Sequence, residues 1–279
     1  MKLLLSFWLE LGKIFRQRGT YAGPAVLLAV CALAVWGLTK EGPDRALARR
    51  VGPDMVVGGR LITAATVGRY VMEPCLIVLL PLMVAAVAGG LVSGEARSGF
   101  LRTWLCRPVS RWAVLTGKQL AAWVHAIFLV ACLGVAALGL GYIFLGGGDL
   151  IEVGSGEGVV ILEEGLALKR LALAYAVAAV LMCAMASLAL MASTIFENPL
   201  VSAAVAVAFL PLCTVVSTLP YFESWKPYLL TTHFEVWRHA FRATLSGGDF
   251  TQSLGCVLAY CLAPYCIGLV IFHLRDVTC

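Results

Sequence analysis

The chain has 279 residues, of which 61% are hydrophobic and 13% are charged, with a mean hydropathy of +0.90 and a formal net charge of +5. This composition is far too apolar for a soluble globular protein of that length. It indicates an all-α integral membrane protein that forms a single domain over residues 1–279. We expect membrane lipid, and no nucleic acid, among its partners.

The N-terminal segment, residues 1–21, has the pattern of an amphipathic helix. Polar residues recur every three or four positions, and apolar residues cover the opposite side. The polar stripe is Lys2, Ser6, Glu10, Lys13 and Gln17, and the apolar face is Leu4, Phe7, Trp8, Leu11, Ile14 and Phe15. Such a helix is expected to lie in the membrane interface rather than to cross the bilayer.

Six apolar runs are long enough to cross the bilayer, which takes about 20 helical residues. Each should be a helix, because irregular backbone cannot face lipid. They lie near residues 22–39, 74–93, 119–145, 171–193, 199–219 and 254–273. In the long connection at 220–252, Phe234, Trp237 and Phe241 share one face of a predicted short helix over 234–245. We expect these rings to rest against other spans or the interface rather than to bind substrate.

The connection between the second and third spans is short and basic. Between Ser93 and Ala122 it carries five bases, Arg97, Arg102, Arg107, Arg111 and Lys118, against the single acid Glu95. Short loops rich in Lys and Arg stay in the cytoplasm. With an even number of spans, both termini are then cytoplasmic, and the protein is expected in the plasma (inner) membrane.

Within this connection, Phe100, Leu101, Trp104 and Leu105 can share one side of a short helix, which Pro108 ends. Two interpretations are open for such a helix at the inner face of the membrane. It can dock a cytoplasmic partner, or it can only anchor the two flanking spans. The spacing alone favours the second interpretation.

The order of residues resembles the segment after the second span in permeases of the type-2 ABC transporter family. The matching residues run Ser93-Gly94-Glu95, Arg97-Ser98-Gly99-Phe100-Leu101, Arg107-Pro108-Val109-Ser110-Arg111 and Gly117-Lys118. The resemblance implies a cytoplasmic coupling helix that fits a groove of an ATPase subunit. Its docking residues would be Glu95, Arg97, Phe100, Leu101, Arg102, Trp104 and Arg107.

The same resemblance implies a second permease copy or paralogue, and a path lined by the second and fifth spans. The main polar groups of the fifth span are Ser202, Thr214, Ser217 and Thr218. A wall so poor in charge suits a lipid-like or otherwise hydrophobic substrate.

The chain lacks its own nucleotide-binding loop. Gly117-Lys118 is followed by Gln119, and residue 112 is Trp, so the phosphate-binding pattern fails at two positions. We therefore expect no catalysis, cofactor or metal in this chain, and ATP and Mg on a partner ATPase. The function predicted is the permease subunit of an ATP-driven exporter. The alternative is a non-transporting membrane scaffold or sensor that docks a partner through residues 94–118.

Overall fold

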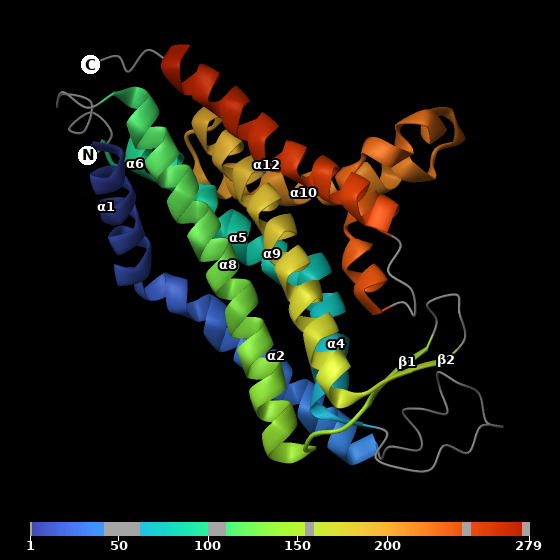
Figure 1. Cartoon of the computed structure of the whole chain (residues 1–279). Helices are drawn as coiled ribbons and strands as arrows, with labels where there is room; N and C mark the ends of the chain where they lie inside the picture. Colours follow the sequence, from blue (N-terminus) through green and yellow to red (C-terminus); the bar gives the residue numbers. More distant parts are fainter. Residues whose placement is uncertain (1, 42–61, 100–109, 154–158, 242–246, 275–279) are drawn as a thin grey trace.

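The computed structural model describes residues 2–41, 62–99, 110–153, 159–241 and 247–274, and the described chain is almost wholly helical (Figure 1). Six helices in this part of the chain are long and apolar enough to cross a membrane. They are Arg18–Lys40, Ala64–Arg97, Arg111–Phe144, Glu164–Ile195, Pro199–Thr218 and Thr251–Leu274. The prediction of an all-α, six-span membrane protein is confirmed.

The second span is longer than its hydropathy suggests. It consists of α4 (Ala64–Pro74), the π-helical η2 (Cys75–Leu79), α5 (Leu80–Ala88) and α6 (Gly90–Arg97). It therefore starts at Ala64 and not near residue 74. Arg69 and Glu73 lower the local hydropathy, which made the first part of this helix look like a loop.

The π-helical turn lies between two prolines. Pro74 precedes η2, and the N–H of Leu80 donates to the carbonyl of Cys75, five residues back. Pro81, which has no N–H to donate, follows directly in α5. The second span therefore contains one widened helical turn between these two prolines.

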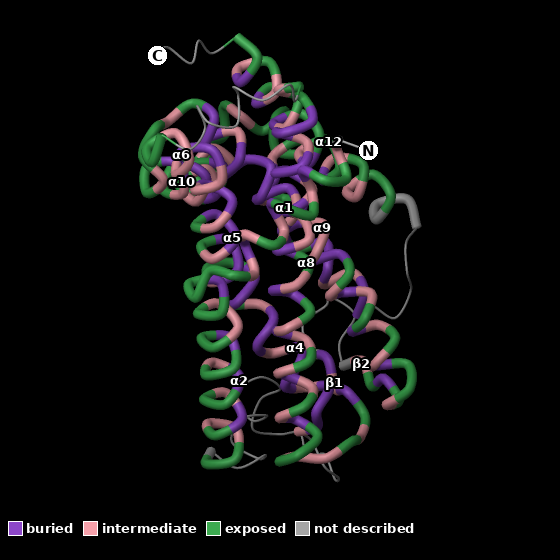
Figure 2. The backbone as a smooth tube through the Cα atoms, turned by 90° about the vertical axis from the view of Figure 1, so that its left-hand side faces the viewer, coloured by how far each residue is buried: buried purple, intermediate pink, exposed green. Residues whose placement is uncertain are grey.

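The fourth span, α9 (Glu164–Ile195), lies at the centre of the bundle. It contacts α8 (Arg111–Phe144), α10 (Pro199–Thr218), α12 (Gly247–Leu274) and α5. Both α8 and α9 begin earlier than predicted, before residues 119 and 171. By contrast α2 (Ala22–Glu41) stands at one side with a largely exposed apolar face (Figure 2).

Two connections contain regular structure of their own. Residues 146–166, between the third and fourth spans, contain an antiparallel hairpin of β1 (Leu150–Val153) and β2 (Val159–Leu162). The single helix predicted over 234–245 is wrong: α11 (Leu230–His233) and the 3₁₀ helix η4 (Val236–Phe241) are separate, and residues 242–246 lie outside the described part.

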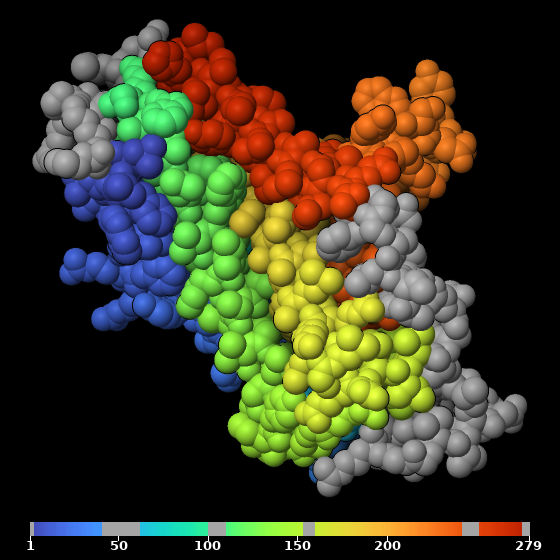
Figure 3. Space-filling view, viewed as in Figure 1, coloured from blue at the N-terminus to red at the C-terminus, as the bar shows by residue number. Residues whose placement is uncertain are grey.

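The aromatic residues of this connection are nonetheless buried. Phe234, Trp237 and Phe241 all belong to the main apolar core, so they rest against other elements as expected. The preceding 3₁₀ segment η3 (Pro220–Tyr228) has no buried residue. This part of the chain, coloured orange, projects from the bundle (Figure 3).

The N-terminal helix α1 (Lys2–Arg16) packs against α8, with the short 3₁₀ helix η1 (Arg18–Tyr21) joining it to α2. Its polar side faces the bundle, where Ser6 and Glu10 are buried, while Leu4 and Trp8 are exposed. An amphipathic helix with its apolar side outward is stable beside lipid rather than water.

Candidate functional site

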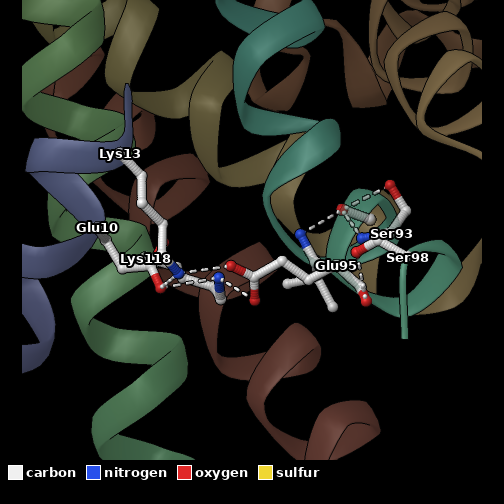
Figure 4. Close-up of polar contacts among 8 residues, drawn as sticks. Glu10, Lys13, Ser93, Glu95, Ser98 and Lys118 are labelled. Atoms are coloured by element: carbon white, nitrogen blue, oxygen red, sulfur yellow. Dashed lines mark hydrogen bonds and ion pairs between the residues drawn. The ribbon is translucent and has the colours of Figure 1, made fainter. Parts of the chain in front are cut away.

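Four charged side chains from three distant segments meet where α1, α6 and α8 come together (Figure 4). The Lys118 ammonium lies 3.0 Å from Glu10 Oε1 and 2.7 Å from Glu95 Oε2. The Lys13 ammonium donates to Glu10 Oε1 at 3.0 Å and to Glu95 Oε1 at 2.8 Å. We call these four residues the charge cluster.

The charge cluster is neutral in sum and largely hidden from solvent. The side chains of Lys118 and Glu10 are only 0% and 1% exposed, whereas Lys13 is 32% exposed. Burial alone would lower the pKa of Lys13. Its hydrogen bonds and charge interactions with Glu95 and Glu10 outweigh this, and its pKa is raised. Buried charges at this density persist only when they are paired and hydrogen-bonded.

The close approach of α1 and α8 depends on Gly117. A Cβ at Gly117 would lie 2.6 Å from Ser6 Oγ and 3.1 Å from the backbone nitrogen of Phe7. The first distance is shorter than real Cβ contacts and the second is tighter than most of them, so a larger residue would force α1 to shift. Gly117 therefore allows the contact, and its neighbour Lys118 provides the charge that holds it.

The other side of the charge cluster is fixed to the core of the bundle. The hydroxyl of Ser193 accepts from the backbone N–H groups of Val92 and Ser93 at 3.1 and 2.9 Å, and it donates to Ser93 Oγ. These bonds tie α6 to α9. At the far end of the connection between the second and third spans, Arg111 Nη1 donates to the carbonyl of His273 at 3.0 Å. This bond ties the start of α8 to the end of α12.

The predicted docking residues are placed only in part. Glu95 turns toward Lys13 and Lys118, and Arg97 is exposed at the end of α6. Phe100, Leu101, Arg102, Trp104 and Arg107 lie outside the described residues. The docking role therefore remains a prediction. The structure adds one observation about the connection between the second and third spans. Glu95, near the end of α6, and Lys118, near the start of α8, bind one another, so the two ends of the connection are held together.

A second set of charges lies at the other end of the second span. Arg69 Nη2 and Nε donate to the two carboxylate oxygens of Glu152 at 2.8 and 3.1 Å. Its guanidinium also lies 4.5 Å from the ring centre of Trp237, a cation–π contact. Glu73 pairs with both Arg69 and Arg238. We call Arg69, Glu73, Glu152, Trp237 and Arg238 the Arg69 cluster.

These contacts explain how Arg69 and Glu73 are stable in an otherwise apolar helix, because each charge is paired. Sequence reasoning missed the Arg69 cluster because it assigned Arg69 and Glu73 to a loop. The sequence did contain a signal, because Arg69 and Glu73 have the spacing of neighbours on one face of a helix and stand at the edge of an apolar run. Charges that occur within a span are paired, so this spacing could have indicated a helix with a charged contact.

The Arg69 cluster borders a cavity of 490 Å³ between the second span, α10 and the 220–241 segment. Two of the four predicted path residues, Thr214 and Ser217, line it. Ser202 is instead buried and donates to the carbonyl of Asn198, and Thr218 donates to Val215 on an exposed surface. The structure therefore brings together half of the predicted set.

Known proteins that are similar to this chain include a transporter family and a bacterial relative. A family model described as ABC-2 family transporter protein matches residues 6–277. The uncharacterized protein YhcI of Bacillus subtilis (strain 168) is 26% identical over 222 residues, which is 77% of this chain and 70% of that protein. The range matched by the family model includes all four residues of the charge cluster.

Proposed function

Because this chain belongs to the ABC-2 transporter family and is therefore the membrane-spanning permease part of an ABC transporter, we propose that a separate ATPase chain powers it. In this proposal the ATPase carries the ATP and Mg, and the substrate moves out of the cell. The chain resides in the plasma membrane, with both termini in the cytoplasm. A second copy or a paralogue completes the pathway.

The charge cluster is the observation that supports this proposal most directly. The predicted coupling segment runs between Glu95 and Lys118, which lie 2.7 Å apart, and both also bind Lys13 or Glu10 of α1. A partner that displaces this segment therefore displaces the second span, the third span and α1 together. A transporter needs such a connection between ATP hydrolysis and the spans.

The exposed apolar surfaces agree with a larger assembly in lipid. On the fifth span, Leu200, Leu212 and Val215 are all exposed, and on α2 so are Leu28, Leu33 and Trp36. Surfaces of this kind are stable only when lipid or a second membrane chain covers them.

The test is copurification of the ATPase with the Trp104→Ala variant. Buried aromatic anchors often cost 2 kcal/mol or more when truncated, so the association should weaken roughly tenfold or more, because 1.4 kcal/mol is a factor of ten. Trp112→Ala is the matched control, because Trp112 is exposed at the start of α8, beyond the predicted docking residues. Insertion into the membrane should be unchanged in both variants.

The alternative, a scaffold or sensor that holds a partner without transport, makes a different prediction. It allows partner binding through residues 94–118 but no hydrolysis coupled to transport. Full ATPase binding and full transport-coupled hydrolysis by the Trp104→Ala variant would remove the docking role. Partner binding without any ATP-dependent transport by the native chain would favour the scaffold.

A further inference from the structure

One residue that lines the cavity beside the Arg69 cluster belongs to η3, a segment with several exposed aromatic side chains. Tyr221, Trp225 and Tyr228 of η3 are 89%, 65% and 68% exposed. Tyr and Trp concentrate where the membrane meets water, because one part of the side chain is apolar and the other polar. Lys226, from the same segment, lines the cavity. From these side chains we infer that this end of the cavity lies at the level of the lipid headgroups.

The polar lining has unused capacity to donate hydrogen bonds. The two acids of the lining, Glu73 and Glu235, are both engaged by Arg238. Lys226 has no ion-pair partner among the described residues. Arg238 Nε and Thr231 Oγ1 are buried without a hydrogen-bond partner in the same part of the chain. Buried donors without a partner are costly, and a bound anionic group would satisfy them.

Apart from the hydroxyl groups of Thr214, Ser217 and Thr232, the remaining wall is apolar, and it is continuous with the outside of the bundle. Ile77 is 55% exposed, and Pro211 is also exposed, whereas Leu210 and Phe234 are buried. An alkyl chain that starts in the cavity can therefore continue along Ile77 and Pro211 into the surrounding lipid. The volume of 490 Å³ lies within the usual range for small-molecule sites.

We propose that this cavity binds an amphiphile whose head is an anionic phosphate or carboxylate group and whose tail is an alkyl chain. Lys226, Arg238 and Thr231 bind the head, and the apolar wall holds the first part of the tail. Binding itself depends only on this cavity. That the bound amphiphile is the transported substrate rests on the proposed function.

Two probes with the same tail and oppositely charged heads, and a third that is an anionic head without a tail, test the proposal. The purified permease, in nanodiscs of uncharged lipid and without ATPase, is titrated calorimetrically with dodecyl phosphate, dodecyltrimethylammonium and inorganic phosphate, and empty nanodiscs are subtracted. We expect saturable binding of dodecyl phosphate, at least about tenfold tighter than either other probe. Lys226→Gln should weaken it roughly tenfold, the value of one charge-assisted hydrogen bond.

Two further variants separate the site from general surface charge. Lys169→Gln removes an exposed lysine near the start of α9 that does not line the cavity, and it should leave binding unchanged. Thr231→Val should weaken binding by less than Lys226→Gln. Equal binding of the cationic probe, equal binding of inorganic phosphate, or an unchanged Lys226→Gln variant would each overturn the proposal. Failure to copurify an ATPase would leave this result standing, so the two proposals fail separately.

Discussion

Replacing Lys118 by Met removes the most buried charge of the charge cluster and keeps an unbranched apolar side chain that is one atom shorter. Glu10 and Glu95 then face one another with only Lys13 between them, and the cluster acquires a net charge of −1. Removing one partner of a buried ion pair costs about 3–5 kcal/mol, because the remaining charge stays buried without compensation. At about 2 °C per kcal/mol for a chain of this size, the melting temperature of Lys118→Met should fall by roughly 6–10 °C.

A double variant tests whether this loss comes from the charges. Adding Glu10→Gln to Lys118→Met leaves Lys13 paired with Glu95 and restores neutrality. The double variant should therefore lose clearly less than the sum of the two single variants. Lys13→Met is the matched control, and it should cost less because Lys13 is 32% exposed. Thermal unfolding of the purified protein in one detergent measures all four variants. If the stability losses of Lys118→Met and Glu10→Gln add up to the loss of the double variant within about 0.5 kcal/mol, the residues of the charge cluster are not coupled.

Three other predictions concern topology and packing. In a background without native cysteines, an impermeant thiol reagent applied to intact cells should label a cysteine at position 155 and miss one at position 98; labelling at 98 would reverse the topology. Gly117→Ala should displace α1 from α8, because its Cβ would meet Ser6 and Phe7. A cross-link engineered between these two helices should then form poorly. Gly139→Ala is the control and should be neutral, because the space around Gly139 is open. Trp237→Ala should lower the free energy of unfolding by about 3–5 kcal/mol, which a melting curve measures, and a changed substrate preference at unchanged stability would contradict this.

The sequence predicts the spans well because their signal is local. Each of the six spans is an apolar run of sufficient length, and the tight turn before the fifth span is marked by Asn198, whose side chain accepts from the N–H of Leu200 as a helix cap. The polar stripe of α1 is also visible in the spacing of its residues. What the spacing leaves open is the direction that the stripe faces, and here it faces protein.

The charged contacts were not predictable in the same way, because they join residues that are far apart in the chain. Lys118 and Glu10 are separated by 108 positions, and Arg69 and Glu152 by 83. Each residue stands out singly, as a charge beside an apolar run, but no local pattern identifies its partner. The hairpin of β1 and β2 was missed for a similar reason, since four-residue strands depend on pairing across a turn.

The second span carries charged residues near each end, Arg69 and Glu73 at one and Glu95 and Arg97 at the other, and none between. Glu73 belongs to the Arg69 cluster and Glu95 to the charge cluster, and residues 74–94 contain no Asp, Glu, Lys or Arg. At 1.5 Å per residue, the 22 steps between them cover roughly 33 Å, close to the 30 Å of hydrocarbon in a typical bilayer. The two clusters therefore mark the two boundaries of the membrane along one helix. The widened turn at Cys75–Leu79 lies just inside one boundary, so a change of helix direction at this turn would tilt the rest of the span without moving Glu73.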